Sequence, residues 1–278
     1  MLVILSRLQF AVTIFYHFIF VPLSIGIILM VTIFEFLHWK KKEDKFRKLA
    51  DYFANMFVII YAIGIVTGIT MSVQFGTNWG EYTAFMGDVF GPPLALEALI
   101  AFFLESTFAG IYFFRRSKMS PKFRTITAGL ILFGTMISAL WIITANGFMQ
   151  NPVGYELAKD GSHVILTNVM ELLLNPYAWY ILIHTTASAL LLGGIFAISV
   201  SVAKILNPKV SEEEKDLFKY VVKIGARVSL IMAIIVPIIG MNYGAFIATV
   251  QPDKIAKIGG ESLIGSSSFS LMVLAGTI

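Results

Sequence analysis

The fold of this chain is decided by one stretch near its start, FAVTIFYHFIFVPLSIGIILMVTIFEF at residues 10–36. This run is longer than the roughly 20 apolar residues that cross the hydrocarbon core of a bilayer. It is too long for the core of a signal peptide, and it has neither a basic leader nor a small-residue cleavage site. We therefore interpret it as the first membrane span.

The composition of the whole chain agrees with a membrane protein. Hydrophobic residues make up 57% of the sequence and charged residues 14%, and the mean hydropathy is +0.81. A water-soluble domain of this size needs more polar surface, so the lipid bilayer is the expected solvent. The chain has no cysteine, which excludes disulfides, iron–sulfur clusters and thiolate-bound zinc. A metal would have to be bound by His, Met or carboxylate side chains.

Six apolar runs have the length of a membrane span. They lie near residues 8–37, 53–74, 93–114, 125–147, 177–203 and 224–248. A seventh run begins near Ser268 and stops at Ile278, far short of a crossing, so we expect another chain or a C-terminal part outside this sequence to complete the bundle. The predicted fold is all-α: a polytopic membrane helix bundle with six full spans and the start of a seventh, in a single domain over residues 1–278.

The basic residues predict the orientation of the spans. Seventeen of the 21 Lys and Arg residues, Arg124 among them, lie in the loops or helix ends that follow the first, third and fifth spans. The positive-inside rule places these loops in the cytoplasm and the N-terminus outside. The net charge of +4 does not indicate a nucleic-acid partner, because the cations are divided among short loops instead of gathering on one surface.

Four charged or imidazole side chains inside predicted spans are weighed as site candidates: His17, Glu97, Glu105 and His184. Each costs about 2.5–3.5 kcal/mol to insert, so each is a candidate functional residue. His17 has apolar and aromatic neighbours on both sides. One interpretation is an interfacial histidine bonded to a backbone carbonyl, but the aromatic surroundings fit a neutral imidazole that faces a planar cofactor better.

His184 is followed by a series of small residues that includes Gly193 and Gly194. Such residues let helices approach closely, and beside a histidine they also make room for a flat ring. Both interpretations stay open on the sequence alone. His38 and His163 lie in or beside loops and receive no role.

Glu97 and Glu105 lie eight residues apart on the predicted third span. In an α-helix this spacing separates them by about 12 Å along the axis and about 80° around it, so they can face one interior. A buried carboxyl group can bind a metal, carry a proton or remain a protonated acid bonded to a neighbouring helix. The spacing alone does not choose among these.

Several longer motifs follow one another along the chain. They are LSRLQFA at residues 5–11, YHFIFVP at 16–22, QFGTNW at 74–79, GPPLALE at 91–97, AFFLEST at 101–107, SALW at 138–141, ANGFMQNP at 145–152 and LNP at 174–176. With these motifs in this order, the chain resembles subunit I of cytochrome bd-type quinol oxidases, in a short or divergent form, over essentially all of its length.

The resemblance implies a set of haem ligands. His17 matches the histidine that ligates a high-spin haem at the oxygen site, and His184 matches one axial ligand of a low-spin haem b. Met272, in the segment FSLM at residues 269–272, matches the second ligand of that haem. A thioether ligand favours ferrous iron and raises the reduction potential. The expected cofactors are haem b and, as a second haem type that the sequence leaves open, haem d.

The resemblance also implies residues for protons and for quinol. Glu97 and Glu105 match glutamates beside the oxygen site, and Ser106 and Ser138 match positions on a proton path. Lys254 matches a lysine of the quinol-binding loop, but this loop is short here and Gly259 stands where the family has a glutamate. We therefore expect quinol binding between the sixth and seventh apolar runs to be weak or absent.

The resemblance implies a haem-binding subunit of a bd-type terminal oxidase that reduces dioxygen to water with proton uptake. It would be a multi-pass protein of a prokaryotic cytoplasmic (inner) membrane, in a complex with a subunit II-like chain or a second subunit I-like chain. Three alternatives remain: a divergent peroxide-reducing or catalase-like enzyme without the usual quinol site, a structural paralogue with few haems, and a channel or transporter. The absence of repeats in the sequence counts against the last.

Overall fold

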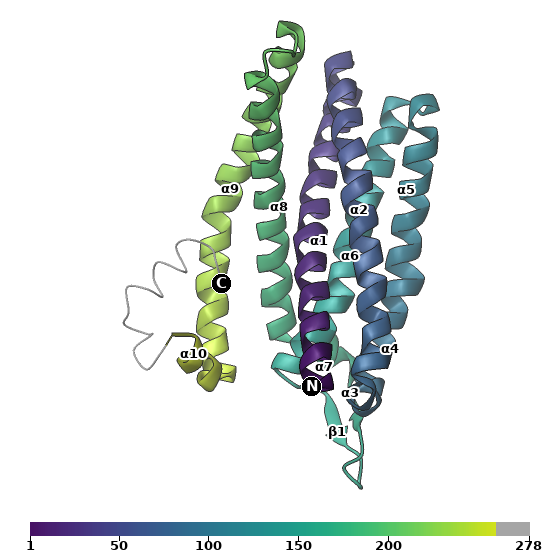
Figure 1. The fold of residues 1–278 in the computed structure, drawn as a ribbon, viewed down its shortest axis with the longest axis vertical. Coiled ribbons are helices and arrows are strands. Elements are labelled where there is room, and N and C mark those ends of the chain that lie inside the picture. Colours follow the sequence, from purple (N-terminus) through teal and green to yellow (C-terminus); the bar gives the residue numbers. More distant parts are fainter. Residues whose placement is uncertain (260–278) are drawn as a thin grey trace.

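The fold is taken from a computed structural model, in which residues 1–259 are described. This part of the chain is a bundle of long helices (Figure 1). The helices are α1 (Leu2–Lys41), α2 (Asp44–Asn78), α3 (Gly80–Phe85), α4 (Gly87–Leu96), the π-helix η1 (Glu97–Phe102), α5 (Phe103–Arg115), the 3-10 helix η2 (Arg116–Lys118), α6 (Pro121–Gln150), α7 (Val169–Leu173), α8 (Pro176–Leu206), α9 (Glu212–Val250) and α10 (Pro252–Gly259).

Within residues 1–259, six helical segments are long and apolar enough to cross a membrane. The third of these combines α4, η1, α5 and η2, and the fifth combines α7 and α8. The predicted all-α bundle of six spans is therefore confirmed. The seventh apolar run and Met272 lie outside the described residues, and the placement of the N-terminus outside the cell stays a prediction.

Several helices extend beyond the apolar runs, and α6, α8 and α9 begin at capped N-termini. In these three helices the N-cap side chain accepts a hydrogen bond from a backbone N–H group of the first turn: Ser120 from Phe123 at 3.3 Å, Asn175 from Tyr177 at 3.0 Å and Ser211 from Glu214 at 3.3 Å. A cap of this kind satisfies a donor that has no partner within the helix. As a result α9 begins at Glu212, although its apolar run begins only near residue 224.

A small hairpin between α6 and α7 was not predicted. Strands β1 (Tyr155–Leu157) and β2 (Val164–Leu166) pair antiparallel, beyond the same end of the bundle as the N-terminus (Figure 1). In the turn, Ser162 donates from its backbone N–H and its hydroxyl to Asp160, and these hydrogen bonds lower the pKa of the exposed carboxyl group. Gly161 follows with a φ of 71°, a conformation that favours glycine.

The helix α1 lies at the centre of the bundle and packs against α2, α6 and α8, while α9 covers α8 (Figure 1). The largest buried cluster lies where the C-terminal half of α1 meets the N-terminal half of α2. It includes Ile27, Ile28, Met30, Val31, Phe34, Phe46, Leu49, Phe53 and Phe57, each at most 2% exposed. The N-terminal half of α1 instead exposes most of its apolar side chains. The apolar core is therefore concentrated in the half of the bundle that the basic loops assign to the cytoplasmic side.

Glycines bring α8 into backbone contact with two neighbouring helices. A Cβ atom built on Gly26 would lie 2.4 Å from the carbonyl oxygen of Ala189, and one built on Gly193 would lie 2.3 Å from the Cα of Gly26. On the other side of α8, a Cβ on Gly194 would lie 2.5 Å from Oγ of Ser229 in α9. These two glycines of α8 therefore serve close helix packing, because neighbouring helices already fill the space beside them.

Candidate functional site

His17 lies between α1 and α2, half-buried. Its Nδ1 lies 3.2 Å from the carbonyl oxygen of Gly64 and 3.0 Å from Oγ1 of Thr67. A carbonyl oxygen only accepts hydrogen bonds, so the proton of a neutral imidazole has to be on Nδ1. The lone pair is then on Nε2, which makes no hydrogen bond to residues 1–259. The bond to a backbone carbonyl and the ligand role therefore use different nitrogens and are compatible.

A glycine of a neighbouring helix makes space for each of the two candidate histidines. A Cβ on Gly68 of α2 would lie 3.0 Å from Cε1 of His17, and a Cβ on Gly240 of α9 would lie 3.1 Å from Cε1 of His184. His184 is 9% exposed, and its ring centroid lies 6.2 Å from that of Tyr243. Both imidazoles are thus seated against the backbone of an adjacent helix, which restricts how each ring can turn.

Glu97 and Glu105 both face α6. Ser138 of α6 donates a hydrogen bond of 2.8 Å to Oε1 of Glu97. Glu105 is 5% exposed, and a Cβ on Gly134, one turn from Ser138, would lie 3.1 Å from the Cβ of Glu105. The two acids are joined by the π-helix η1, which starts at Glu97. Such wide turns often occur at functional sites, and this one changes the angle expected from regular α-helical spacing.

The remaining proton-path and quinol candidates are placed differently. Ser106 donates to the carbonyl oxygen of Phe103 in its own helix at 3.3 Å, so only Ser138 is brought to a glutamate. Nζ of Lys254 donates to Oε1 of Gln150 at 2.8 Å and to the hydroxyl of Tyr177 at 3.1 Å. This lysine therefore ties α10 to the adjacent ends of α6 and α8.

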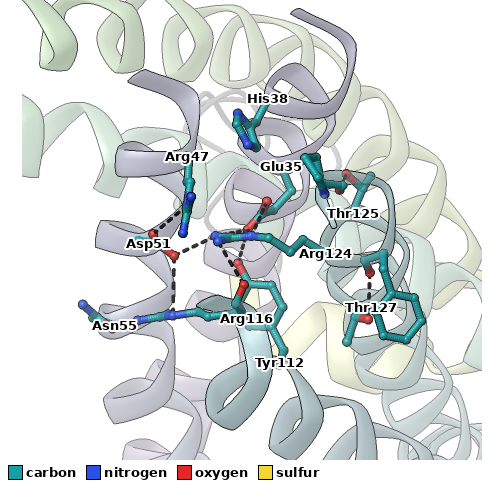
Figure 2. Close-up of polar contacts among 12 residues, drawn as sticks. Glu35, His38, Arg47, Asp51, Asn55, Tyr112, Arg116, Arg124, Thr125 and Thr127 are labelled. Carbon is teal, nitrogen blue, oxygen red and sulfur yellow. Dashed lines mark hydrogen bonds and ion pairs between the residues drawn. The ribbon is translucent and has the colours of Figure 1, made fainter. Parts of the chain in front are cut away.

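A buried ionic cluster was not predicted from the sequence. It lies at the end of the bundle opposite to Lys254. Glu35 of α1 is 0% exposed and faces Arg124 of α6, which is 2% exposed (Figure 2). Nε of Arg124 lies 2.9 Å from both carboxylate oxygens, and Nη2 lies 2.6 Å from Oε1. The hydroxyl of Tyr112 in α5 also donates to Glu35. We call these three residues with Asp51 the inner ion cluster.

Asp51 extends the inner ion cluster to α2. Its Oδ1 accepts from Nη2 of Arg124 at 2.7 Å and lies 3.4 Å from Nε of Arg116, which also donates to Asn55 (Figure 2). The cluster therefore joins α1, α2, α5 and α6. An acid inside the first apolar run was the only sequence signal for it, because nothing in the spacing identifies Arg124 as the partner of Glu35.

The donor chemistry of these residues fits haem. A porphyrin supplies the equatorial nitrogens itself, so one imidazole, or an imidazole and a thioether, completes the ligand set. Nε2 of His17 is available in the required tautomer. Among residues 1–259, no three His, Asp or Glu side chains are grouped to bind a bare metal ion.

Comparisons with known proteins all point to one protein family. A family model for cytochrome bd terminal oxidase subunit I matches residues 5–275. Cytochrome bd ubiquinol oxidase subunit 1 of Bacillus subtilis (strain 168) is 40% identical over 253 residues, which cover 91% of this chain and 53% of the relative. Cytochrome bd-II ubiquinol oxidase subunit 1 of Escherichia coli (strain K12) is 37% identical over 257 residues, covering 92% and 49%.

A solved structure agrees with this match. The bd oxidase of Geobacillus thermodenitrificans aligns with a TM-score of 0.86 at 25% sequence identity, and the alignment covers 94% of this chain and 59% of that chain. This chain spans about half the length of the two curated relatives above.

Proposed function

Because the chain belongs to the family of cytochrome bd terminal oxidase subunit I, we propose that it is the haem-binding subunit of a bd-type terminal oxidase. The proposed enzyme lies in the cytoplasmic membrane of a bacterium and reduces dioxygen to water. A subunit II-like chain or a second subunit I-like chain completes the complex. When bound, the haems supply the iron centres that take up electrons and bind dioxygen.

The arrangement of His17 is the observation that supports this proposal best. Its Nδ1–H is held by Gly64 and Thr67, so Nε2 presents a lone pair suited to the iron of a high-spin haem. On the other side of α1, His184 would hold the low-spin haem b together with Met272. The imidazole of His184 rests against Gly240 of α9, which limits its rotation.

Glu97, Glu105 and Ser138 are the proposed proton carriers. Reduction of dioxygen to water consumes one proton for each electron, so a site buried in the membrane needs groups that bring protons to it. The hydroxyl of Ser138 donates to Oε1 of Glu97, so Oε2 is the oxygen that would take up a proton. Glu105 is buried on the same side, against α6, and would pass protons toward Glu97.

We predict that His184→Ala and Met272→Leu each alter the same low-spin haem, because two axial ligands act on one iron. Reduced-minus-oxidised spectra of the purified complex should lose or shift the low-spin bands in both variants. His163→Ala, at a partly exposed loop histidine, is the matched control and should match the parent. Unchanged low-spin bands in both ligand variants would refute the axial pair. A parent complex without any reducible haem bands would refute the proposed function.

For the electron donor, we predict that Lys254→Ala leaves steady-state oxidation of ubiquinol- and menaquinol-type donors unchanged in the intact complex. Lys254 already bonds to Gln150 and Tyr177, and the connection that carries it is too short to form a separate lid. Electrons would then come from another subunit or a different donor. Lys159→Ala, in the hairpin loop, serves as the control. Fast quinol oxidation that collapses only in the Lys254 variant would contradict this prediction.

A further inference from the structure

Three side-chain contacts join the N-terminal half of α1 to the C-terminal half of α2. They link Asn78 to Gln9 at 2.9 Å, Gln74 to Thr13 at 2.9 Å and Thr67 to His17 at 3.0 Å. The three α1 residues are spaced four apart, so they lie on one face of that helix. We call these contacts the polar ladder. It begins at the end of the helix pair and leads to the proposed iron ligand.

The middle contact of the polar ladder is the most buried. Gln74 is 3% exposed, and its Nε2 donates to Oγ1 of Thr13, whose own hydroxyl donates to the carbonyl oxygen of Gln9. A buried amide that loses its partner is costly, because it keeps its desolvation penalty without a compensating bond. A shift of α1 by one turn along α2 would break this contact. The ladder therefore fixes the height of His17 relative to α2.

The last contact fixes the orientation of the imidazole. The hydroxyl of Thr67 lies 2.8 Å from the carbonyl oxygen of Ile63 and donates along its own helix. Its oxygen is then an acceptor for Nδ1–H of His17, in addition to the carbonyl oxygen of Gly64. Gly68 lets the ring lie against the α2 backbone. The plane of the imidazole ring is therefore defined by the two acceptors that share its Nδ1–H and by the α2 backbone beside it.

We propose that Thr67 is a positioning residue for the high-spin haem, acting through His17. This inference rests on the proposed role of His17 as the iron ligand. A hydrogen bond to the second nitrogen of a ligating imidazole fixes its tautomer and orientation and strengthens its donation to the metal. Thr67 supplies that bond together with the Gly64 carbonyl, and the polar ladder keeps the two helices in the register that the bond requires.

The test compares Thr67→Val with Thr67→Ser in the purified complex. Valine has nearly the shape of threonine but no hydroxyl, whereas serine keeps the hydroxyl. The two readouts are the retention of the high-spin haem during purification and the iron–histidine stretching band in resonance Raman spectra of the ferrous protein. Thr67→Val is expected to weaken haem retention about tenfold and to shift the band to lower frequency. Thr67→Ser is expected to retain both properties of the parent.

Thr70→Val is the matched control, since Thr70 lies three residues further along α2 and, among the described residues, its hydroxyl donates only to the carbonyl oxygen of Val66. It should leave both readouts unchanged. An unshifted band in Thr67→Val would overturn the proposal. If Thr67→Val assembles without haem, recovery of haem and band in Thr67→Ser supports the proposal, and no recovery overturns it. His17→Ala distinguishes a failure of the Thr67 proposal from a failure of the proposed ligand role of His17. An iron–histidine band that persists in His17→Ala refutes the ligand assignment itself.

Discussion

Arg124→Met is expected to lower the free energy of unfolding by about 3–5 kcal/mol, because it leaves the fully buried carboxylate of Glu35 without its cation. Methionine fills a similar length but donates no hydrogen bond. The loss of Arg124 also removes a contact to Asp51, and with it a connection between α6 and α2. Denaturant titration in detergent, followed by the helical circular dichroism signal, measures the change.

The control for this prediction is Arg47→Met. Arg47 lies 4.0 Å from Asp51 at a partly exposed position of α2, so its removal should cost no more than about 1 kcal/mol. The double variant Glu35→Met with Arg124→Met removes both buried charges and should recover much of the lost stability. Equal stability of Arg124→Met and Arg47→Met would mean that the inner ion cluster does not hold the helix ends together.

His17→Ala is expected to abolish carbon monoxide binding at the high-spin haem and to leave the low-spin bands in place. Nε2 of His17 is the proposed iron ligand, and alanine offers no group that replaces it. The low-spin haem would keep its signal because its proposed ligands, His184 and Met272, are unchanged. Carbon monoxide difference spectra of the purified complex, normalised to the low-spin haem, measure the loss.

His38→Ala provides a matched control on the same helix. His38 is 7% exposed, and its Nδ1 bonds to the carbonyl oxygen of Glu43 at 3.1 Å, within the turn that ends α1. Its spectra should match those of the parent. A carbon monoxide difference spectrum of His17→Ala that equals the parent spectrum would show that another residue ligates the high-spin haem.

Length and hydropathy were enough to predict the number and order of the membrane spans. Each apolar run is long enough to cross the hydrocarbon core of a bilayer. The spans can therefore be located without knowing how the helices pack. The helix ends were harder to predict, because capping residues such as Ser120 and Ser211 extend a helix into polar sequence that a hydropathy window excludes. The hairpin was missed although Asp160-Gly161, between the segments Tyr155–Leu157 and Val164–Leu166, is a typical turn signal.

A residue of the candidate site can be predicted from the sequence where its polar side chain is costly to bury in the membrane. His17, Glu97 and Glu105 stand out because each is polar at membrane depth. The inner ion cluster could not be predicted, since Glu35 and Arg124 lie 89 positions apart and the charge pattern places Arg124 among the loop cations. The positioning role of Thr67 also could not be predicted, because a threonine that bonds to its own helix is common and only the packing of α1 on α2 brings His17 to it.

The backbone contact between Gly26 and Gly193 has a consequence for biogenesis. The ribosome has to synthesise the whole segment between these residues before α8 can dock on α1, which takes on the order of 10–30 seconds at typical elongation rates. During this interval α1 can pair with α2 and α6, but its surface at Gly26 faces lipid or the insertion machinery. A larger side chain at either glycine would therefore act late, as a block to final docking, and not as a defect in membrane insertion.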